Sequence, residues 1–410
     1  MSTKTKKSKK PKPFKKANNF VYRILRFILR PILKRKYRFK FDKDTSKDIT
    51  RPCFILSNHQ TGFDQFAVGI GFKFGINFVA SDTIFKMGIG SWFMRKLGRP
   101  IPFSKGTSDP IAVKNMMQVI ADGGAVGIFP EGNRCFFGET MRIQPGTARL
   151  AKKLNVPLVL VQLRGAYMTK PRFKVKKNKG KCSGHVVRVV TPDEMKAMTN
   201  EELEEIIKAS LYVNEFDYNA EKRIEFKGEA KAENIEAILF YCPACGGSDC
   251  LASEVHDLWC TKCNARVTVD EYGFFVNDGV NQKILPPTIL EWSSKQIEFV
   301  KSYDFSQHAD TPVFSDDNVT LGVSIRAQTD VDVVTGSMAL YSDRLEICDK
   351  IFYLKDVAAL SMQEVRKMSI YTATETYSLE VPLKTNITKY MICGYHIKNL
   401  AEGKPEYYGY

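Results

Sequence analysis

The stretch that decides the fold reads Cys53-Phe54-Ile55-Leu56-Ser57-Asn58-His59-Gln60-Thr61-Gly62-Phe63-Asp64. Its first four residues predict a short buried strand, and Thr61-Gly62 predicts a turn. On a regular helix a five-residue step turns through about 500°, which would leave His59 and Asp64 on different sides of the axis. We therefore predict that the pair lies on a loop entering a helix near Asp64, where the carboxylate can reach one imidazole nitrogen.

His59 and Asp64 have the chemistry of a general base and its orienting acid. An imidazole with its ordinary pKa of about 6.5 can take a proton from a hydroxyl near neutral pH, and a carboxylate can fix its tautomer and stabilise the imidazolium. An ordinary structural alternative also fits, in which His59 bonds to backbone and Asp64 caps a helix.

A second block follows the apolar run 125–129, which predicts another buried strand that ends at Pro130. Ligands of open α/β sheets bind at strand ends, so Glu131 and Arg134 are candidates for binding one. The arginine fork suits a phosphate, and Gly132 lets a ligand approach the backbone closely. The alternative for this block is a surface salt bridge.

With these two blocks, residues 20–235 resemble the glycerolipid acyltransferase family, whose members include the 1-acyl-glycerol-3-phosphate acyltransferases. The resemblance implies an α/β fold with a mixed sheet covered by helices. It also implies transfer of a fatty acyl group from a thioester donor, acyl-CoA or acyl-carrier protein, to the free hydroxyl of a lysophospholipid in phospholipid biosynthesis. Carried over residue by residue, His59 is the base, Asp64 orients it, and the acceptor contacts are Glu131, Gly132, Asn133 and Arg134.

The chain departs from the family pattern at two places that concern the acceptor. Asn133 stands where the family has threonine or serine. In the intervening block 98–105, Lys105 replaces the family's arginine one position late, and a lysine binds phosphate only as a point charge. We expect Lys105 or Arg99 to join Arg134 at the phosphate. Another lysophospholipid or a glycolipid is the alternative acceptor.

The amino terminus predicts attachment to an anionic surface. Residues 1–17 carry eight lysines and no acid, which predicts a disordered tail. Residues 18–40 predict an amphipathic helix, with Arg23, Arg26 and Arg30 on one side, that is too short and charged to span a bilayer. It suits the membrane interface, so we expect a peripheral, monotopic protein on the cytoplasmic face of the cell membrane. The alternative is a helix packed on the domain with a basic exposed face.

The net charge of +16 also raises nucleic acid as a partner. About half of that charge lies in the tail, which favours an anionic membrane surface, and we expect nucleic acid not to be the partner. A different class of function remains open, namely a basic protein that contains the zinc ribbon predicted below, binds nucleic acid or membrane, and carries an inactive acyltransferase-like domain.

Two Cys-x-x-Cys pairs predict a zinc ribbon over residues 237–278. Cys242 and Cys245 form the first pair, and Cys260 and Cys263 the second. Four thiolates at this spacing suit tetrahedral, structural Zn²⁺ with no open position for catalysis. Cys250 and His256 lie nearby, and we expect them to serve local structure. Disulfides are the alternative, which a cytoplasmic location disfavours.

At 410 residues and 44% hydrophobic content, the chain has room for two sizeable folded units beside the ribbon. The first is the acyltransferase domain, residues 41–236. A linker with a helix spans 279–320, and short alternating stretches over 321–410 predict an antiparallel β domain ending in a helix near 389–400. This last arrangement resembles a pleckstrin-homology or GRAM-type barrel, which implies lipid or protein binding. A plain β-sandwich is the alternative.

Overall fold

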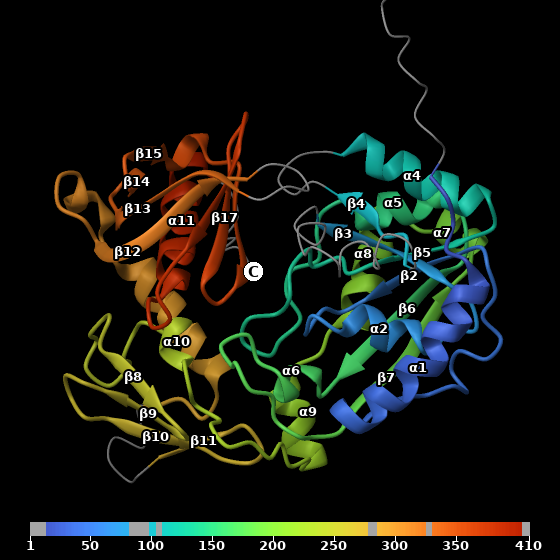
Figure 1. The fold of residues 1–410 in the computed structure, drawn as a ribbon, viewed down its shortest axis with the longest axis horizontal. Helices are drawn as coiled ribbons and strands as arrows, with labels where there is room; N and C mark the ends of the chain where they lie inside the picture. The colour runs from blue at the N-terminus through green and yellow to red at the C-terminus, as the bar shows by residue number, and fades with distance from the viewer. Residues whose placement is uncertain (1–13, 82–97, 104–108, 278–284, 325–329, 404–410) are drawn as a thin grey trace, which may run out of the picture.

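The computed structural model describes residues 14–81, 98–103, 109–277, 285–324 and 330–403. Within these ranges the chain forms three β-sheets, each in its own part of the molecule (Figure 1). The predicted fold class is confirmed: a helix-covered mixed sheet comes first, then a small cysteine-bearing ribbon, then a β-rich unit.

The first sheet has the order β1-β7-β6-β2-β5-β3-β4. Strands β2, β5, β3 and β4 run parallel to their neighbours, while β6 and β7 are antiparallel to each other. The strand bounds are β1 Phe39–Phe41, β2 Cys53–Ser57, β3 Ile76–Ser81, β4 Ile101–Phe103, β5 Ala125–Ile128, β6 Leu158–Arg164 and β7 Cys182–Val190.

Helices cover both faces of this sheet because its central strands are apolar on both sides. In β2, Phe54 and Leu56 pack with the helices of one face, while Cys53 and Ile55 pack with those of the other. The first face carries α4 Pro110–Ala121, α5 Thr147–Leu154, α7 Pro192–Ala197 and α8 Asn200–Leu211. The second carries α1 Asn19–Tyr37 and α2 Asp64–Gly69, and the short helices α6 Ala166–Thr169 and α9 Glu215–Lys222 complete the domain.

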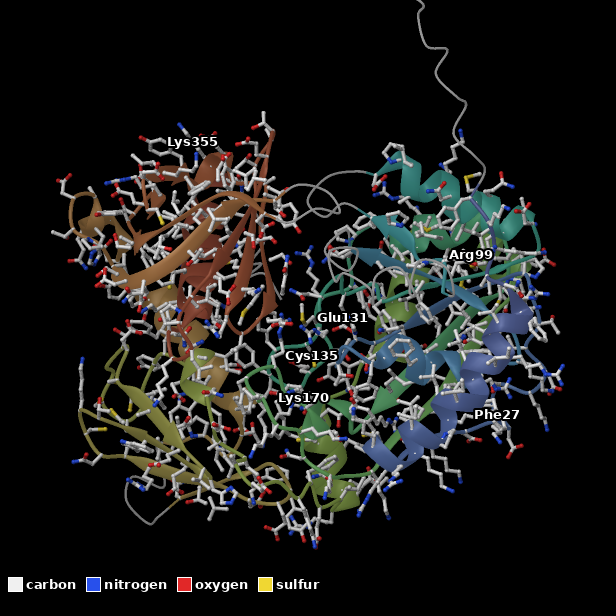
Figure 2. The ribbon with its side chains drawn as sticks, in the orientation of Figure 1. Phe27, Arg99, Glu131, Cys135, Lys170 and Lys355 are labelled. Atoms are coloured by element: carbon white, nitrogen blue, oxygen red, sulfur yellow. The ribbon has the colours of Figure 1, made fainter. Side chains whose placement is uncertain are left out.

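Helix α1 turns Arg26 and Arg30 toward the domain and exposes part of its apolar surface, while Arg23 is exposed. Arg26 donates to the carbonyl oxygen of Phe72 at 2.7 Å, and Arg30 to that of Ile70 at 3.3 Å. Phe27 is 81% exposed and projects from the outer edge of the molecule (Figure 2). Its exposed apolar neighbours on the helix are Phe20, Ile24, Ile28 and Ile32. Helix α1 thus packs on the domain through Leu33 and exposes apolar side chains together with Arg23 and the basic residues of its last turn, so both readings of this helix stay open.

None of the helices in the described ranges combines the length and apolar character needed to cross a membrane. The amino-terminal tail lies largely outside the described residues, which begin at Phe14.

The ribbon is a four-stranded antiparallel sheet in the order β11-β10-β9-β8. Its strands are β8 Leu251–Glu254, β9 Asp257–Cys260, β10 Arg266–Val269 and β11 Phe275–Asn277, preceded by the 3-10 turn η2 Ile235–Ala237. Helix α10 Ile289–Ser302 and the turn η3 Phe305–His308 lead into the last unit.

The carboxy-terminal unit is a seven-stranded antiparallel sheet in the order β15-β14-β13-β12-β18-β17-β16, with α11 Ile387–Glu402 buried against it. Its strands are β12 Phe314–Val323, β13 Val331–Leu340, β14 Arg344–Ile347, β15 Lys350–Tyr353, β16 Ala359–Glu364, β17 Lys367–Tyr371 and β18 Thr376–Glu380, with the turn η4 Leu354–Asp356. The first strand begins at Phe314, ahead of the expected residue 321. Polar residues and an irregular register between Asp316 and Val319 hide the alternation there.

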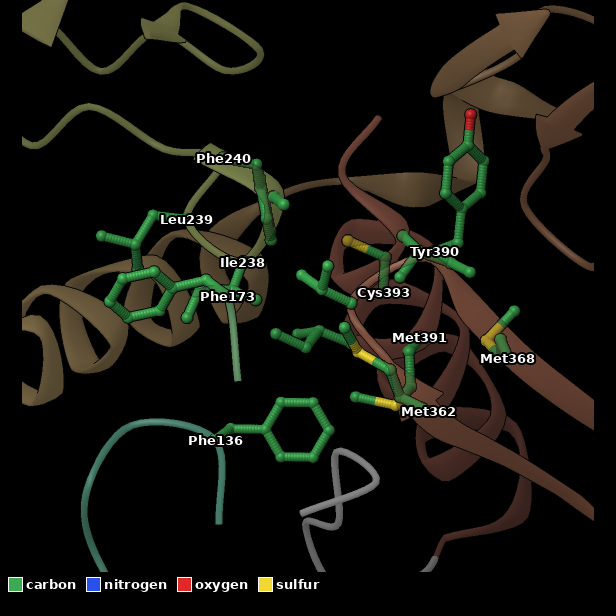
Figure 3. Close-up of a cluster of buried hydrophobic side chains, with 14 of the residues drawn as sticks. Phe136, Phe173, Ile238, Leu239, Phe240, Met362, Met368, Tyr390, Met391 and Cys393 are labelled. Atoms are coloured by element: carbon green, nitrogen blue, oxygen red, sulfur yellow. The ribbon is translucent and has the colours of Figure 1, made fainter. Parts of the chain in front are cut away.

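One apolar cluster runs through all three parts of the molecule. It joins Phe136 and Phe173 of the first domain to Ile238 at the entrance of the ribbon and to Met362 and Met391 of the last unit. Figure 3 shows these side chains facing one another between the units. The units therefore pack through a shared core.

Candidate active site

The two motifs meet because they follow neighbouring strands. Strands β2 and β5 are parallel and paired, with Leu56 opposite Ile128. Their carboxyl ends therefore open at the same edge of the sheet, where His59 follows β2 and Glu131 follows β5. A backbone hydrogen bond of 2.8 Å from Cys135 N to the His59 carbonyl ties the two loops together.

His59 and Asp64 form a hydrogen-bonded pair, with 2.8 Å between Nδ1 and Oδ2. Asp64 is the first residue of α2 and is fully buried. Its carboxylate also accepts from the backbone nitrogens of Gln60 at 2.5 Å and Thr61 at 2.8 Å, and from the Thr61 hydroxyl at 2.6 Å. These donors hold the carboxylate in place. An Nδ1 proton directed at Asp64 makes Nε2 the basic nitrogen of the ring.

Glu131 is buried beneath the histidine loop. Its two carboxylate oxygens accept from His59 N at 2.5 Å and from Met141 N at 2.8 Å. Burial raises the pKa of Glu131 to about 8, although the two backbone amides oppose that rise. With both oxygens engaged by backbone, Glu131 fixes the position of His59.

A third buried carboxylate, absent from the sequence-based candidates, supports the same loop. Glu215 of α9 accepts from the side-chain amide of Gln60 and from Gly165 N. Gln60 in turn accepts from the backbone nitrogens of Ala166 and Tyr167 at 3.1 and 3.2 Å. Burial raises the pKa of Glu215 to about 7. Gln60 and Glu215 are 155 residues apart, and no sequence motif linked them.

Arg134 lies between the loop that carries His59 and Asp64 and the carboxy-terminal unit. Its Nη1 would be 3.7 Å from a Cβ placed on Gly62, and its Nη2 donates to the Gln363 carbonyl of β16. Asn133 Oδ1 accepts from Arg134 N at 3.1 Å. Gly132 has a positive φ of 72°, a conformation that glycine adopts without a steric cost. Figure 2 shows Glu131, Cys135 and Lys170 in this central region between the units.

Arg99 is engaged away from this centre. Its Nη1 donates to the Lys16 carbonyl at 2.8 Å, and its own carbonyl accepts from the Asn77 side chain at 2.8 Å. Figure 2 shows it well apart from Glu131. The structure thus does not bring Arg99 to Arg134. Lys105, the other candidate for the phosphate, lies outside the described residues.

An aromatic stack connects His59 to an apolar cavity. The Phe129 ring lies 4.3 Å from the imidazole and 5.6 Å from the ring of Phe78, measured between centroids. Phe78 lines a cavity of about 140 Å³ between α1, α2 and β3. The other apolar side chains of its wall include Leu25, Leu29, Phe66 and Ile76.

The four predicted cysteine ligands come together in the ribbon. All four Sγ atoms lie within 4.8 Å of one another. The Sγ atoms of Cys242 and Cys263 are 3.8 Å apart, and those of Cys245 and Cys260 are 3.7 Å apart. A tetrahedron with Zn–S bonds of about 2.3 Å has edges of about 3.8 Å, so the spacing fits tetrahedral thiolate ligation. Cys250 lies beside this group, 3.5 Å from the Sγ of Cys260.

Comparison with known proteins places the motifs in a family context. The model of the Acyltransferase family matches residues 38–163. The chain is 30% identical over 118 residues to the chloroplastic 1-acyl-sn-glycerol-3-phosphate acyltransferase BAT2 of Brassica napus, covering 28% of this chain and 33% of the relative. It is 28% identical over 127 residues to the 1-acyl-sn-glycerol-3-phosphate acyltransferase of Bacillus subtilis (strain 168), covering 30% of this chain and 62% of that protein.

The crystal structure of the 1-acyl-sn-glycerophosphate (LPA) acyltransferase PlsC from Thermotoga maritima is similar with a TM-score of 0.40 and 21% identity, covering 47% of this chain and 76% of that one. The chain thus spans about a third of the length of the Brassica relative and 62% of the Bacillus one. Residues 38–163, which match the Acyltransferase family model, hold both motifs, and the chain resembles the glycerolipid acyltransferase family, as its motifs predict.

Proposed function

We propose that the protein is a peripheral membrane acyltransferase that moves a fatty acyl group from a thioester donor to the free hydroxyl of 1-acyl-glycerol-3-phosphate. The observation that carries the proposal is the hydrogen bond of 2.8 Å between His59 and the buried carboxylate of Asp64. This pair lies at the same edge of the sheet as residues 130–134, the loop predicted to contact the acceptor and called the acceptor loop below. The donor is acyl-CoA or acyl-carrier protein, and the product enters phospholipid biosynthesis.

In the proposed mechanism, His59 Nε2 takes the proton of the acceptor hydroxyl as its oxygen attacks the thioester carbonyl. Asp64 stabilises the imidazolium that forms. A backbone amide of these loops would stabilise the oxyanion of the tetrahedral intermediate. Its collapse breaks the carbon–sulfur bond, and the imidazolium returns the proton to the leaving thiolate. Arg134 would hold the acceptor phosphate, with Lys105 as a second cation.

The apolar cavity beside Phe78 is the proposed site for an acyl chain. Its wall is almost wholly apolar. Phe78 of this wall stacks on Phe129, which in turn stacks on the His59 imidazole. Helix α1 supplies Leu25 and Leu29 to this wall and exposes Phe27 on its outer side. The same helix would therefore lie in the membrane interface and form part of the cavity that receives a lipid chain.

Attachment to the cytoplasmic face of the cell membrane would use both apolar and basic groups. Lys34, Arg35 and Lys36 occupy the last turn of α1, next to its exposed apolar face. Each basic group near an anionic leaflet contributes about 1 kcal/mol before screening.

For the cysteine group we propose a structural Zn²⁺ held by Cys242, Cys245, Cys260 and Cys263. Bound zinc would cross-link the two turns of the ribbon and leave no open position for catalysis. The ribbon would then help to hold α11, because Asp249 lies 2.6 Å from the Lys389 ammonium of that helix.

Acyl transfer on anionic vesicles tests the proposed function. Purified protein would receive lysophosphatidate with acyl-CoA or acyl-carrier protein, beside other lysophospholipids and a glycolipid as acceptors. His59→Ala should abolish transfer, and His185→Ala, on β7, should retain it. Equal transfer by the two variants would contradict the role of His59. Transfer only to another acceptor would change the substrate, and salt-dependent oligonucleotide binding without transfer would favour the binding function.

A further inference from the structure

Arg172 is a buried cation at the boundary between the first domain and the carboxy-terminal unit. Its residue is 8% exposed, and it lies in the segment that follows α6. Removing a guanidinium from water is unfavourable unless hydrogen bonds replace the lost hydration. The contacts of Arg172 therefore indicate what this charge does in the fold.

Two segments, residues 133–136 and β16, contact the Arg172 guanidinium. Nη1 donates to Asn133 Oδ1 at 3.1 Å and to the Arg134 carbonyl at 2.8 Å, both in the acceptor loop. Nη2 donates to the Met362 carbonyl of β16 at 2.6 Å. Its central carbon lies 4.1 Å from the centroid of the Phe136 ring, which continues the acceptor loop into the shared core.

The neighbouring residue of β16 holds the other arginine. Gln363 presents its carbonyl to Nη2 of Arg134, so two successive carbonyls of one strand bind two arginines. The Gln363 side chain is itself held by the Ser369 hydroxyl of β17 at 2.5 Å. Strand β16 is thus a fixed support for Arg134.

Two other cations lie close to Arg134, so its guanidinium needs hydrogen-bond acceptors to stay in this position. Arg172 and Lys170 both lie near Arg134. The pKa of each is lowered, mainly by burial and next by repulsion from Arg134. Glu364, at the end of β16, is the nearby acid that offsets this repulsion. Without the carbonyls of β16, repulsion would favour an Arg134 rotamer turned away from the other two cations.

We propose that Arg172 is a positioning residue for the acceptor site, which ties the loop 133–134 to β16 so that Arg134 presents its guanidinium to the acceptor phosphate. The carboxy-terminal unit is then part of the acceptor site and determines selectivity for a phosphate-bearing acceptor. This inference rests on the proposed function, because it assigns Arg134 to the acceptor phosphate.

Arg172→Lys is the decisive variant, because lysine keeps the charge but loses the planar fork that contacts both segments. With lysophosphatidate as acceptor, KM should rise about tenfold or more while kcat changes little. With the phosphate-free analogue 1-acylglycerol, kcat/KM should stay within about threefold. General damage to the fold would instead lower kcat/KM for both acceptors by a similar factor.

Arg344→Lys is the matched control. Arg344 also lies 4.1 Å from an aromatic centroid, that of Tyr341, and donates to a backbone carbonyl, that of Ala309 at 3.1 Å, but on β14. We expect this control to leave both KM values unchanged. An Arg172→Lys variant with wild-type selectivity between the two acceptors would overturn the inference.

Hydrogen–deuterium exchange tests the same contact without activity. In Arg172→Lys, amides of residues 133–136 should exchange at least about tenfold faster, including the Cys135 amide that binds the His59 carbonyl. Unchanged exchange would overturn the role of Arg172. Failure of wild-type protein to acylate lysophosphatidate would instead overturn the proposed function, and faster exchange in Arg172→Lys would then still show that Arg172 holds the loop 133–136.

Discussion

Replacing Asp64 with asparagine removes one charge from the site while leaving its shape nearly intact. The asparagine oxygen can take the position of Oδ2, where His59 Nδ1, Gln60 N and Thr61 N all donate. The new amide nitrogen then faces the Thr61 hydroxyl, which can accept instead of donate. The variant therefore tests the electrostatic part of the proposed mechanism separately from the geometric part.

The expected loss in rate follows from the lost attraction to the imidazolium. The N–O contact is 2.8 Å, and the two delocalised charges are centred roughly 4 Å apart. At an effective dielectric constant of about 20 their attraction is about 4 kcal/mol, so kcat should fall about 10³-fold. His59→Ala should be lower still, because it removes the base itself.

The assay is initial-rate transfer from acyl-CoA to lysophosphatidate on anionic vesicles at saturating substrate. Asp304→Asn is the control, since Asp304 also accepts from a backbone amide and a hydroxyl, both of Ser306, but caps η3, outside residues 38–163. A loss of less than about tenfold in Asp64→Asn, with a wild-type melting temperature, would refute this account of Asp64.

Three further predictions concern stability, metal and membrane. Because burial raises the pKa of Glu131 to about 8 from its ordinary 4.5, the folded state retains a proton that the unfolded chain releases, so stability should fall as pH rises across that interval. Between pH 5 and pH 8, the free energy of unfolding measured in urea should fall less for Glu131→Gln than for wild type, and equal falls would contradict this. Purified protein should carry one zinc ion per chain by elemental analysis, Cys263→Ser should lose it and melt at lower temperature, and a full zinc content in that variant would contradict the ligand assignment. Phe27→Ala should weaken vesicle binding about tenfold or more in sedimentation, since a buried phenylalanine contributes roughly 1.5–3 kcal/mol, while the control Ile111→Ala on α4, 66% exposed, should not.

The sequence was sufficient to predict the edge of the sheet where the motifs lie, because that prediction depends on local patterns. Apolar runs at residues 53–56 and 125–129 predicted strands, and β2 and β5 cover most of those residues. The turn at Thr61 and Gly62 predicted a helix beginning near Asp64, which is where α2 begins. Each of these predictions needed only a few neighbouring residues.

Contacts between segments far apart in the sequence could not be predicted, because no local pattern marks them. Arg172 reaches Met362 across 190 residues, and its own neighbours in the sequence include several other basic residues. The strands β16 and β17 lie inside the predicted β domain, but the sequence does not mark them individually. Each has three consecutive buried residues, so the alternation that marks a strand with one exposed face is missing.

The orientation of α1 shows a different limit. Its sequence predicted a stripe of arginines beside an apolar surface, but a helical pattern does not say which side meets the protein. The carbonyls of Ile70 and Phe72 determine that, because they accept hydrogen bonds from Arg30 and Arg26. Those acceptors exist only once α2 has ended and the chain has turned.

The shared apolar core also bears on how this protein can be divided. A chain cut at residue 236 would keep both sequence motifs but expose Phe136 and Phe173, which pack in the same cluster as Met362 and Met391. Such a fragment would present a large apolar surface to water and would tend to aggregate. The region that carries the family motifs is therefore smaller than the unit that folds.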